Sequence, residues 1–369
     1  MSWQTLHPEY YPDQLEAKRQ HLIQALAPWY PAAPRVFTST PSHYRMRAEF
    51  RIWHQGEQCD FAMFPPGGGA PQLMEQFPIA NRQINRLMLE LRQQLLSSRE
   101  LSHKLFQVDF LTTQTGQALI SLIYHRRLDT PWQLQAERLA KVLQAGIIGR
   151  SRKQKLVIGE DHLHEQLWVN GRTYTYRQAE QSFVQPNALV CEKMLGWAQQ
   201  ATAGVGGDLL ELYCGLGNFT LPLSHQFDRV LATEVAKPSI ALAQHNAEIN
   251  QCHNIQFVRL SSEEVSEALS GSRVFRRIEE AEINLSAYDF RCVLVDPPRA
   301  GLDPATLSLV AGFEYIVYIS CHLDSLTDNL ATLAQTHQVE QVALFDQFPF
   351  TEHQETGVLL RRHKRTSLR

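Results

Sequence analysis

The chain has 369 residues, of which 44% are hydrophobic and 20% are charged, and its formal net charge is −3. This composition fits a globular protein of about two domains, and no apolar run approaches the roughly 20 residues that a membrane-crossing helix needs. Since the N-terminus has no signal-peptide pattern and the six cysteines form no CxxC pair, we expect a cytoplasmic protein without a membrane anchor, a metal site or a disulfide framework.

The first half of the chain is predicted to be a mixed α+β domain. Its predicted elements are an alternating strand (44–54), an amphipathic helix (83–97), a hairpin around QTGQ (106–113 and 118–125) and a second helix (131–145). Residues 1–180 hold 21 basic and 16 acidic residues, whereas residues 181–369 hold 14 and 22. A basic first half suggests an anionic partner, although ordinary variation in charge explains the difference equally well.

The second half follows a different pattern. Five short apolar runs are mostly unbroken and several are separated by helix-like stretches, which is typical of strands buried on both faces of a parallel sheet. The runs are GDLLELYCG, DRVLATE, NIQFVRL, DFRCVLVD and FEYIVYISC. Two further strands, 338–346 and 356–362, are predicted to form a closing hairpin. Five β/α steps followed by a hairpin are the layout of Rossmann-like methyltransferases that use S-adenosyl-L-methionine.

A glycine-containing stretch, LELYCGLGNF (210–219), follows the first of these strands. Gly215 and Gly217 would let the backbone turn tightly and approach a ligand at the carboxyl end of the sheet. The third glycine of a dinucleotide-binding motif is replaced by Thr220, which favours an adenosine–methionine ligand. The alternative is a plain glycine turn.

Two carboxylates close further strands of the same sheet. Glu234 ends the second strand, where an acidic side chain can accept hydrogen bonds from both ribose hydroxyls. Asp296 ends the fourth strand and begins DPPR, whose prolines fix the backbone and leave carbonyls free for a ligand. The alternatives are a surface carboxylate for Glu234 and a rigid turn without chemistry for Asp296.

Several stretches along nearly the whole chain match one known family. They are LELYCGLGNF (210–219), DPPR (296–299), YISC (318–321), FDQFPFTEHQE (345–355), SHYRMRAEFRIWH (42–54), HKLFQVDFLTT (103–113) and SFVQPN (182–187). Together they resemble the RNA uracil-5-methyltransferases, and the match is closest to the bacterial tRNA enzymes. The N-terminal TRAM domain and the iron–sulfur cysteines of larger relatives are not recognisable here.

The resemblance implies roles for individual residues. Cys321 would be the nucleophile and Glu355 the general base. The pocket for S-adenosyl-L-methionine would be lined by Gln185, Tyr213, Gly215, Asn218, Glu234 and Asp296. The sequence departs from the family pattern at His322 and Leu323, where SCNP is usual, and at Leu216, where a polar residue is common. None of these departures removes a reacting group.

The implied chemistry explains why a single cysteine follows an apolar strand. Uracil C5 becomes nucleophilic only after a thiolate adds to C6, so the pKa of Cys321 must fall from its usual value near 8.5. The N-terminus of a following helix would favour the thiolate, with Asp324 or Ser325 as its cap. The alternative for Cys321 is a buried small residue, as assumed for Cys292.

The RNA surface is predicted on the first half of the chain. In alternation, Arg45, Arg47, Arg51 and Trp53 would share one strand face. Phe106 and His125, on the neighbouring strands, could stack on bases of a loop. We expect this sheet to bind the T-arm loop of tRNA. The alternative is that the aromatic side chains belong to the core and the arginines to a solvated face.

These observations predict a two-domain enzyme, an α+β RNA-recognition domain (1–180) followed by a Rossmann-like catalytic domain (181–369). The catalytic domain would have a seven-stranded sheet with a terminal antiparallel hairpin. Its predicted activity is the formation of 5-methyluridine in the T-loop of tRNA. The enzyme is expected to be a monomer, and another structured RNA with a similar loop is left open as a second substrate. The alternatives are a methyltransferase for another target, above all a ribosomal uracil, and an RNA-binding protein without catalysis.

Overall fold

The protein is described from a computed structural model, which covers residues 6–56, 58–65 and 67–364. The chain forms two compact units. Unit 1 comprises residues 1–9, 40–166 and 177–188, and unit 2 comprises residues 10–39, 167–176 and 189–369. The predicted division into functional domains at residue 180 stays a prediction. No helix in the described part of the chain combines the length and apolarity that crossing a membrane requires.

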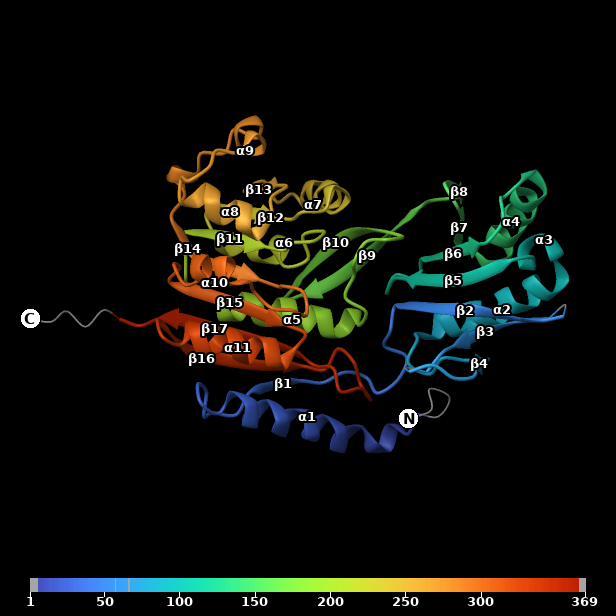
Figure 1. Ribbon diagram of the computed structural model, residues 1–369, viewed down its shortest axis with the longest axis horizontal. Coiled ribbons are helices and arrows are strands. Elements are labelled where there is room, and N and C mark those ends of the chain that lie inside the picture. The colour runs from blue at the N-terminus through green and yellow to red at the C-terminus, as the bar shows by residue number, and fades with distance from the viewer. Residues whose placement is uncertain (1–5, 57, 66, 365–369) are drawn as a thin grey trace, which may run out of the picture. The chain divides into compact units, whose positions relative to one another are not determined.

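Unit 1 is built on a seven-stranded sheet with helices packed against it (Figure 1). The strand order is β4-β3-β2-β5-β6-β7-β8, and every neighbouring pair is antiparallel except β6 and β7. Its elements are β2 (Arg47–Gln55), β3 (Gln58–Met63), β4 (Gln72–Met74), α2 (Arg82–Ser97), α3 (Arg99–Ser102), β5 (Leu105–Thr112), β6 (Ala118–Tyr124), α4 (Thr130–Leu143), β7 (Gly146–Ser151) and β8 (Gln154–Ile158).

One face of this sheet packs against α2 and α4. The two helices begin where short polar side chains satisfy free backbone amides: Asn81 accepts from the Ile84 N–H, and Asp129 accepts from the Trp132 N–H. Each such cap is worth about 1 kcal/mol. The core between helices and sheet contains Phe50, Ile52, Leu87, Leu91, Val108, Phe110, Ile120, Leu122 and Trp132. The predicted strand, hairpin and two helices of the first half are confirmed.

The opposite face of the sheet is polar. Along β2 the exposed or half-buried Arg47, Glu49, Arg51 and Trp53 alternate with buried side chains up to Trp53, as the pattern predicts, and His54 and Gln55 at the end of the strand are also exposed. Asp109 on β5 pairs with Glu49 across the ladder, and burial raises the pKa of its carboxyl to about 6. This face therefore carries charges of both signs rather than arginines alone.

A separate two-stranded sheet is formed by β9 (His162–Val169) and β10 (Arg172–Ala179). Each strand begins in one unit and ends in the other. The sequence analysis did not single out these strands. Their alternation of buried and exposed side chains is regular in the structure.

Unit 2 contains an eight-stranded sheet of order β1-β16-β17-β15-β14-β11-β12-β13 (Figure 1). The strands are β1 (Arg35–Phe37), β11 (Asp208–Leu212), β12 (Val230–Thr233), β13 (Ile255–Val258), β14 (Phe290–Val295), β15 (Tyr315–Ser320), β16 (His337–Phe345) and β17 (Glu355–Arg362). The five strands from β11 to β15 are parallel, and β17 is antiparallel to both of its neighbours. The predicted parallel strands and closing hairpin are thus present.

Helices cover both faces of this sheet, as in other doubly wound folds. They are α1 (Tyr11–Leu26), α5 (Ala188–Ala201), α6 (Thr220–Leu223), α7 (Lys237–Ile249), α8 (Ser262–Leu269), α9 (Arg276–Glu280), α10 (Pro304–Val310) and α11 (Leu323–Leu333), with single 3₁₀ turns at Pro8–Tyr10, Ser224–Gln226 and Leu285–Ala287. One face packs on α1, α8, α10 and α11 through Leu22, Val265, Val310 and Leu330. On the other face Trp197 of α5 meets Phe345 of β16, with ring centroids 5.7 Å apart.

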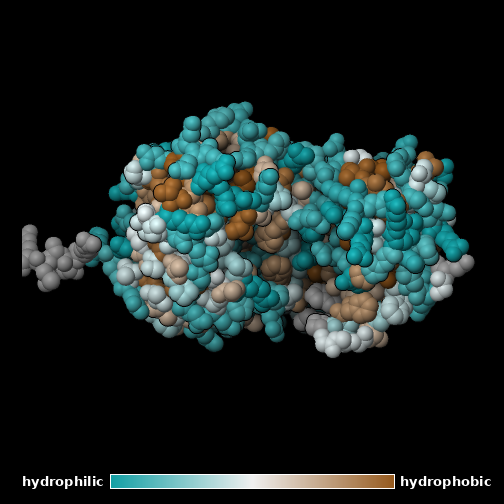
Figure 2. Space-filling model, turned by 45° about the horizontal axis from the view of Figure 1, so that its top comes forward, coloured by the Kyte–Doolittle hydropathy of each residue, from teal (hydrophilic) through white to brown (hydrophobic). Residues whose placement is uncertain are grey.

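The eighth strand of the sheet was not predicted. β1 lies early in the chain but pairs in parallel with β16, where Val36 is opposite Leu344. Residues 10–39, including α1, therefore belong to unit 2. Figure 2 shows a mostly hydrophilic surface on which apolar side chains form separate patches, as expected when the cores lie beneath the helices.

Candidate active site

The loop that follows β11 has the backbone conformation of a ligand-binding turn. Tyr213, Gly215 and Gly217 all have positive φ angles, of 62°, 56° and 88°. Such a conformation costs roughly 1–2 kcal/mol for a residue with a Cβ, so Tyr213 is strained. At Gly217 a Cβ would lie 2.7 Å from Leu221 Cδ1, whereas at Gly215 it would meet nothing within 4 Å. Gly217 therefore permits close packing against Leu221, and Gly215 leaves open space beside the loop.

Side chains from three other elements hold this loop in place. Asn246 of α7 donates to the Leu216 carbonyl at 3.0 Å, and the Tyr176 hydroxyl of β10 donates to the Asn218 carbonyl at 2.9 Å. The Asn218 amide nitrogen also lies 3.3 Å from Cys191 Sγ. The sequence analysis missed Asn246, Tyr176 and Cys191, because their contacts with the loop depend on tertiary packing.

Glu234 follows β12 directly and turns back to the same loop. Its two carboxylate oxygens accept from the Gly215 N–H at 3.2 Å and from the Ala236 N–H at 2.8 Å. The side chain is half-buried. A carboxylate has about four acceptor positions, so two remain for hydroxyl groups of a ligand. The Tyr213 hydroxyl donates to the Ser262 hydroxyl at 2.9 Å.

Three carboxyl groups lie near the carboxyl ends of the strands: Glu211 and Glu355 are buried, and Asp296 is half-buried. Burial raises the pKa of Glu211 to about 8 and that of Asp296 to about 7, and it raises the pKa of Glu355 well above its usual range. The charge of Asp296 raises the pKa values of both Glu211 and Glu355 further. This region therefore favours positive charge in a ligand.

Cys321 comes directly after β15, at the same edge of the sheet. It is half-buried, whereas the other five cysteines are buried. The following helix, α11, begins at Leu323 and is capped by His322, whose Nδ1 accepts from the Ser325 N–H at 3.4 Å. The prediction that Asp324 or Ser325 caps this helix was wrong. The capping residue is His322, one of the positions that depart from the family pattern.

Cys321 and Glu355 are neighbours at the end of the β15–β17 ladder. Ser320 pairs with Thr356 in that ladder, and Cys321 and Glu355 are the next residues on the two strands. Burial first, and then the carboxylates of Glu355 and Asp296, raise the pKa of the Cys321 thiol to about 11. The expectation of a lowered pKa is wrong for the unliganded protein. Arg299 acts in the opposite direction but is the weakest influence.

The loop before Glu355 is anchored by a buried ion pair that the sequence analysis missed. Lys18 Nζ of α1 lies 2.6 Å from Asp346 Oδ1 and also donates to the carbonyls of Phe348 and His353. Both side chains are at most 5% exposed. Three hydrogen bonds donated by one ammonium fix both ends of the loop. A lysine in an amphipathic helix gives no sequence signal of such a role.

The predicted RNA-binding residues of unit 1 divide into two groups. The Arg51 guanidinium lies 4.0 Å above the Phe106 ring, and Phe106 stacks on His125 with centroids 4.1 Å apart. Arg51 and His125 are exposed. Arg45 and Arg47 are half-buried instead, since Arg45 donates to the Arg47 carbonyl and Arg47 donates to the Ser182 carbonyl. Only the first group forms a free stacking surface.

The remaining predicted site residue, Gln185, lies in unit 1 and is half-buried. The site described above in unit 2 is therefore built from the other five pocket residues with Cys321 and Glu355. Within the described ranges, no three or more His, Cys, Asp or Glu side chains gather as they would around a metal ion.

Comparison with known families identifies the chain. The sequence model of the family described as tRNA (Uracil-5-)-methyltransferase matches residues 10–363. The chain belongs to this family. The tRNA/tmRNA (uracil-C(5))-methyltransferase of Acinetobacter baylyi is 52% identical to this methyltransferase over 354 residues, which cover 95% of this chain and 98% of the relative. The protein of the same name from Ectopseudomonas mendocina is 53% identical over 363 residues, covering 98% and 100%.

A solved structure confirms the fold of the methyltransferase. The tRNA (uracil-54, C5)-methyltransferase of Pyrococcus abyssi, in complex with S-adenosyl-L-homocysteine, matches it with a TM-score of 0.72 at 19% identity. The match covers 95% of this chain and 83% of that chain. The predictions of the family, of a methyltransferase and of its fold class are confirmed. β1 is an addition to the seven strands that were predicted.

Proposed function

We propose that this chain transfers a methyl group from S-adenosyl-L-methionine to C5 of a uracil in the T-arm loop of tRNA. The observation that carries the proposal is the pairing of a half-buried thiol, Cys321, with a buried carboxyl, Glu355, at the ends of adjacent strands. Thiol addition to C6 and removal of the C5 proton require these two groups side by side. The names of the relatives supply the substrate.

The residues of unit 2 fit a nucleoside that carries a positive charge. Gly215 leaves open space beside the loop, and Glu234 keeps two acceptor positions for ribose hydroxyls. The half-buried carboxyl of Asp296 makes no hydrogen bond or ion pair within the described ranges. A cation beside Asp296 would remove the electrostatic penalty that raises the pKa values of its neighbours. S-adenosyl-L-methionine, when bound, supplies an electrophilic methyl group on such a cationic sulfur.

The chain's own residues perform the remaining chemistry. Cys321 loses its proton and adds to uracil C6, so that the ring becomes an enolate and C5 becomes nucleophilic. After the methyl group is on C5, ionised Glu355 removes the C5 proton, and the thiolate of Cys321 leaves. The Lys18–Asp346 pair fixes the loop that precedes the base. Burial and the neighbouring Asp296 raise the pKa of Glu355 well above its usual range, so the carboxylate that removes the C5 proton forms less readily in the free protein.

Unit 1 supplies the proposed RNA surface. The row of Arg51, Phe106 and His125 presents a cation and two rings across three neighbouring strands. Stacking on an aromatic side chain contributes about 1–3 kcal/mol per base and suits an unpaired loop. That Arg45 and Arg47 contribute to the RNA surface stays a prediction, as does the place of Gln185 in the cofactor pocket. Because tRNA is a cytoplasmic RNA, we expect the enzyme to act there, as a monomer without a metal.

The relatives' names couple tRNA with tmRNA. We therefore take tmRNA as the second structured RNA that the sequence analysis left open. A ribosomal target remains the competing function.

Labelled methyl transfer tests the substrate. We expect the purified protein to methylate tRNA and a tRNA T-arm hairpin at a single uracil, and to leave the same hairpin with cytosine at that position unmodified. Mass mapping of nucleosides from cells with and without the gene should show loss of 5-methyluridine from tRNA. Loss from ribosomal RNA with intact tRNA would contradict the proposal.

Cofactor binding is expected to change the pKa of Cys321. In the free protein the thiolate is scarce below pH 11 and increases as the pH rises through that value. A neighbouring cationic sulfur should lower the midpoint of the pH profile for alkylation of Cys321 by between roughly one and three pH units. S-adenosyl-L-homocysteine has a neutral sulfur, so it should leave the midpoint near its value in the free protein.

Alkylation by iodoacetamide, followed by peptide mass spectrometry, checks this expectation at Cys321 alone. The Cys321→Ala variant supplies the background from the five buried thiols. Equal midpoints with the two ligands would mean that the charge of the sulfur does not reach Cys321, which contradicts the proposed placement of the methyl donor beside the thiol.

A further inference from the structure

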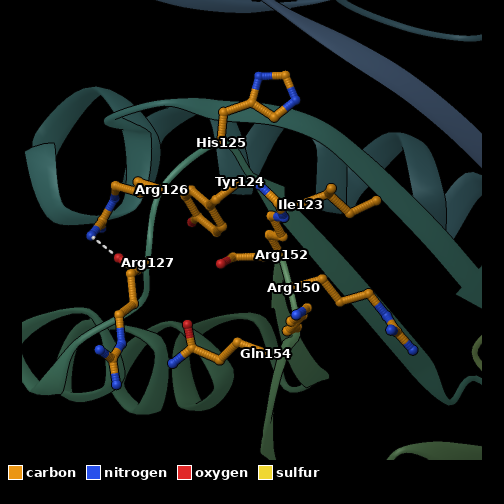
Figure 3. Close-up of a pocket in the computed structure, with 10 residues that line it drawn as sticks. Ile123, Tyr124, His125, Arg126, Arg127, Arg150, Arg152 and Gln154 are labelled. Atoms are coloured by element: carbon orange, nitrogen blue, oxygen red, sulfur yellow. Dashed lines mark hydrogen bonds between the residues drawn. The ribbon is translucent and has the colours of Figure 1, made fainter.

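A wide basic cavity lies at one end of the seven-stranded sheet of unit 1 (Figure 3). Its volume is about 860 Å³. The cations that line it are Arg126, Arg127, Arg150, Arg152 and Lys153, His125 lies beside them, and no acidic side chain lines it. They come from the end of β6 and from the β7–β8 hairpin, which the parallel pairing of β6 with β7 brings together.

Two of these cations are engaged within unit 1. Arg150 makes a two-pronged ion pair with Glu180, at 2.6 and 2.7 Å. Arg126 donates to the carbonyls of Glu100, His103 and Arg127. These contacts stabilise the walls of the cavity. They use several donors of each guanidinium group, so neither group has all of its donors left for a ligand.

The other arginines and the lysine are available. Arg127, Arg152 and Lys153 are exposed, and within the described ranges none of them makes an ion pair or a side-chain hydrogen bond. Lys153 has a φ of 60° at the tip of the hairpin, a conformation in which glycine or asparagine is usual.

The two segments that carry these free cations are fixed to each other. The Gln154 amide accepts from the Leu128 N–H at 2.9 Å and donates to the Leu128 carbonyl at 2.8 Å. Figure 3 shows Gln154 lying between Arg127 and Arg150. The cations therefore lie on two segments that are hydrogen-bonded to each other rather than on independent loops.

His125 connects the cavity with the stacking row. It lines the cavity and also stacks on Phe106. We propose that the cavity binds two backbone phosphates of the substrate RNA, next to the bases that stack on Phe106 and His125. The inference rests on the proposed function. A space of this size with five cations in its lining suits a sugar–phosphate backbone better than one small anion.

A charge-removing double variant tests the proposal. Arg152→Gln/Lys153→Asn takes two cations from the hairpin, and asparagine tolerates the positive φ at position 153. The matched control is Arg138→Gln/Lys141→Gln, which takes two exposed cations from α4 outside the cavity. For each protein, tRNA affinity is measured against salt concentration, together with KM and kcat for methyl transfer.

Each phosphate contact contributes about 0.7–0.9 to the slope of log K against log salt. We expect the cavity variant to lose about 1.5 from the magnitude of the slope and to raise KM about tenfold, with kcat and S-adenosyl-L-homocysteine affinity unchanged. The control should keep the wild-type slope. Equal slopes for all three proteins would overturn the inference while wild-type turnover still supports the proposed function. Competition by inorganic pyrophosphate beyond its effect on ionic strength would indicate a small-anion site and would also overturn it.

Discussion

Cys321→Ala is expected to abolish methyl transfer to tRNA, with a loss of roughly 10⁴-fold or more, as is typical when a covalent nucleophile is removed. Without the thiol, nothing adds to uracil C6, and C5 stays unreactive. The same variant should fail to form a stable adduct with RNA containing 5-fluorouracil, in which fluorine replaces the proton that the base removes. Gel electrophoresis under denaturing conditions detects that adduct.

Two controls separate a chemical role from a structural one. Cys59→Ala removes a buried thiol from unit 1 and should retain turnover and adduct formation. The Cys321→Ala protein should still bind S-adenosyl-L-homocysteine, since the loop after β11 is held by residues other than Cys321. Full turnover by Cys321→Ala would refute the assignment of the nucleophile.

Glu355→Gln is expected to stop the reaction at a later step. Cys321 can still add to C6 and C5 can still accept the methyl group, but no carboxylate is present to take the C5 proton. A covalent complex that contains the methylated base should therefore accumulate on ordinary tRNA, and turnover should fall by roughly 10²–10⁴-fold. Mass spectrometry of the complex, before and after nuclease digestion, identifies the methylated base.

The fold is expected to tolerate this change. Burial raises the pKa of Glu355 well above its usual range and so favours the neutral carboxyl, and a glutamine amide is neutral and has nearly the same shape. The matched control is Glu352→Gln, which alters an exposed carboxylate three residues away and should leave turnover unchanged. If Glu355→Gln released product at the wild-type rate, another group would have to be the base.

Sequence patterns were sufficient for the elements that carry the chemistry. Unbroken apolar runs predicted the buried parallel strands, and the residues that end them, Glu234, Asp296 and Cys321, lie where the pattern indicated. Such a pattern can be read from the sequence because each of these polar residues directly follows its own strand in the chain. The roles of these residues still rest on the family resemblance and on the experiments above.

Features that depend on distant pairing were not predictable. Lys18 and Asp346 are 328 residues apart, and β1 joins β16 across a similar separation. The pKa of Cys321 was predicted in the wrong direction because the burial of the thiol, and after it the carboxylates of Glu355 and Asp296, depend on how distant strands pack together. Arg127 follows β6, whereas Arg152 and Lys153 form the turn between β7 and β8, and the parallel β6–β7 pair brings the two segments to one cavity.

The short length of β1 has a consequence for how molecules of this protein meet in a crowded cell. With β1 in place, the large sheet ends on one side in a strand of three residues and on the other in β13, a strand of four. Long flat borders invite backbone pairing with a neighbouring copy, and such pairing starts aggregation. Borders this short present few unpaired amides and carbonyls, so the sheet resists growing into a fibre.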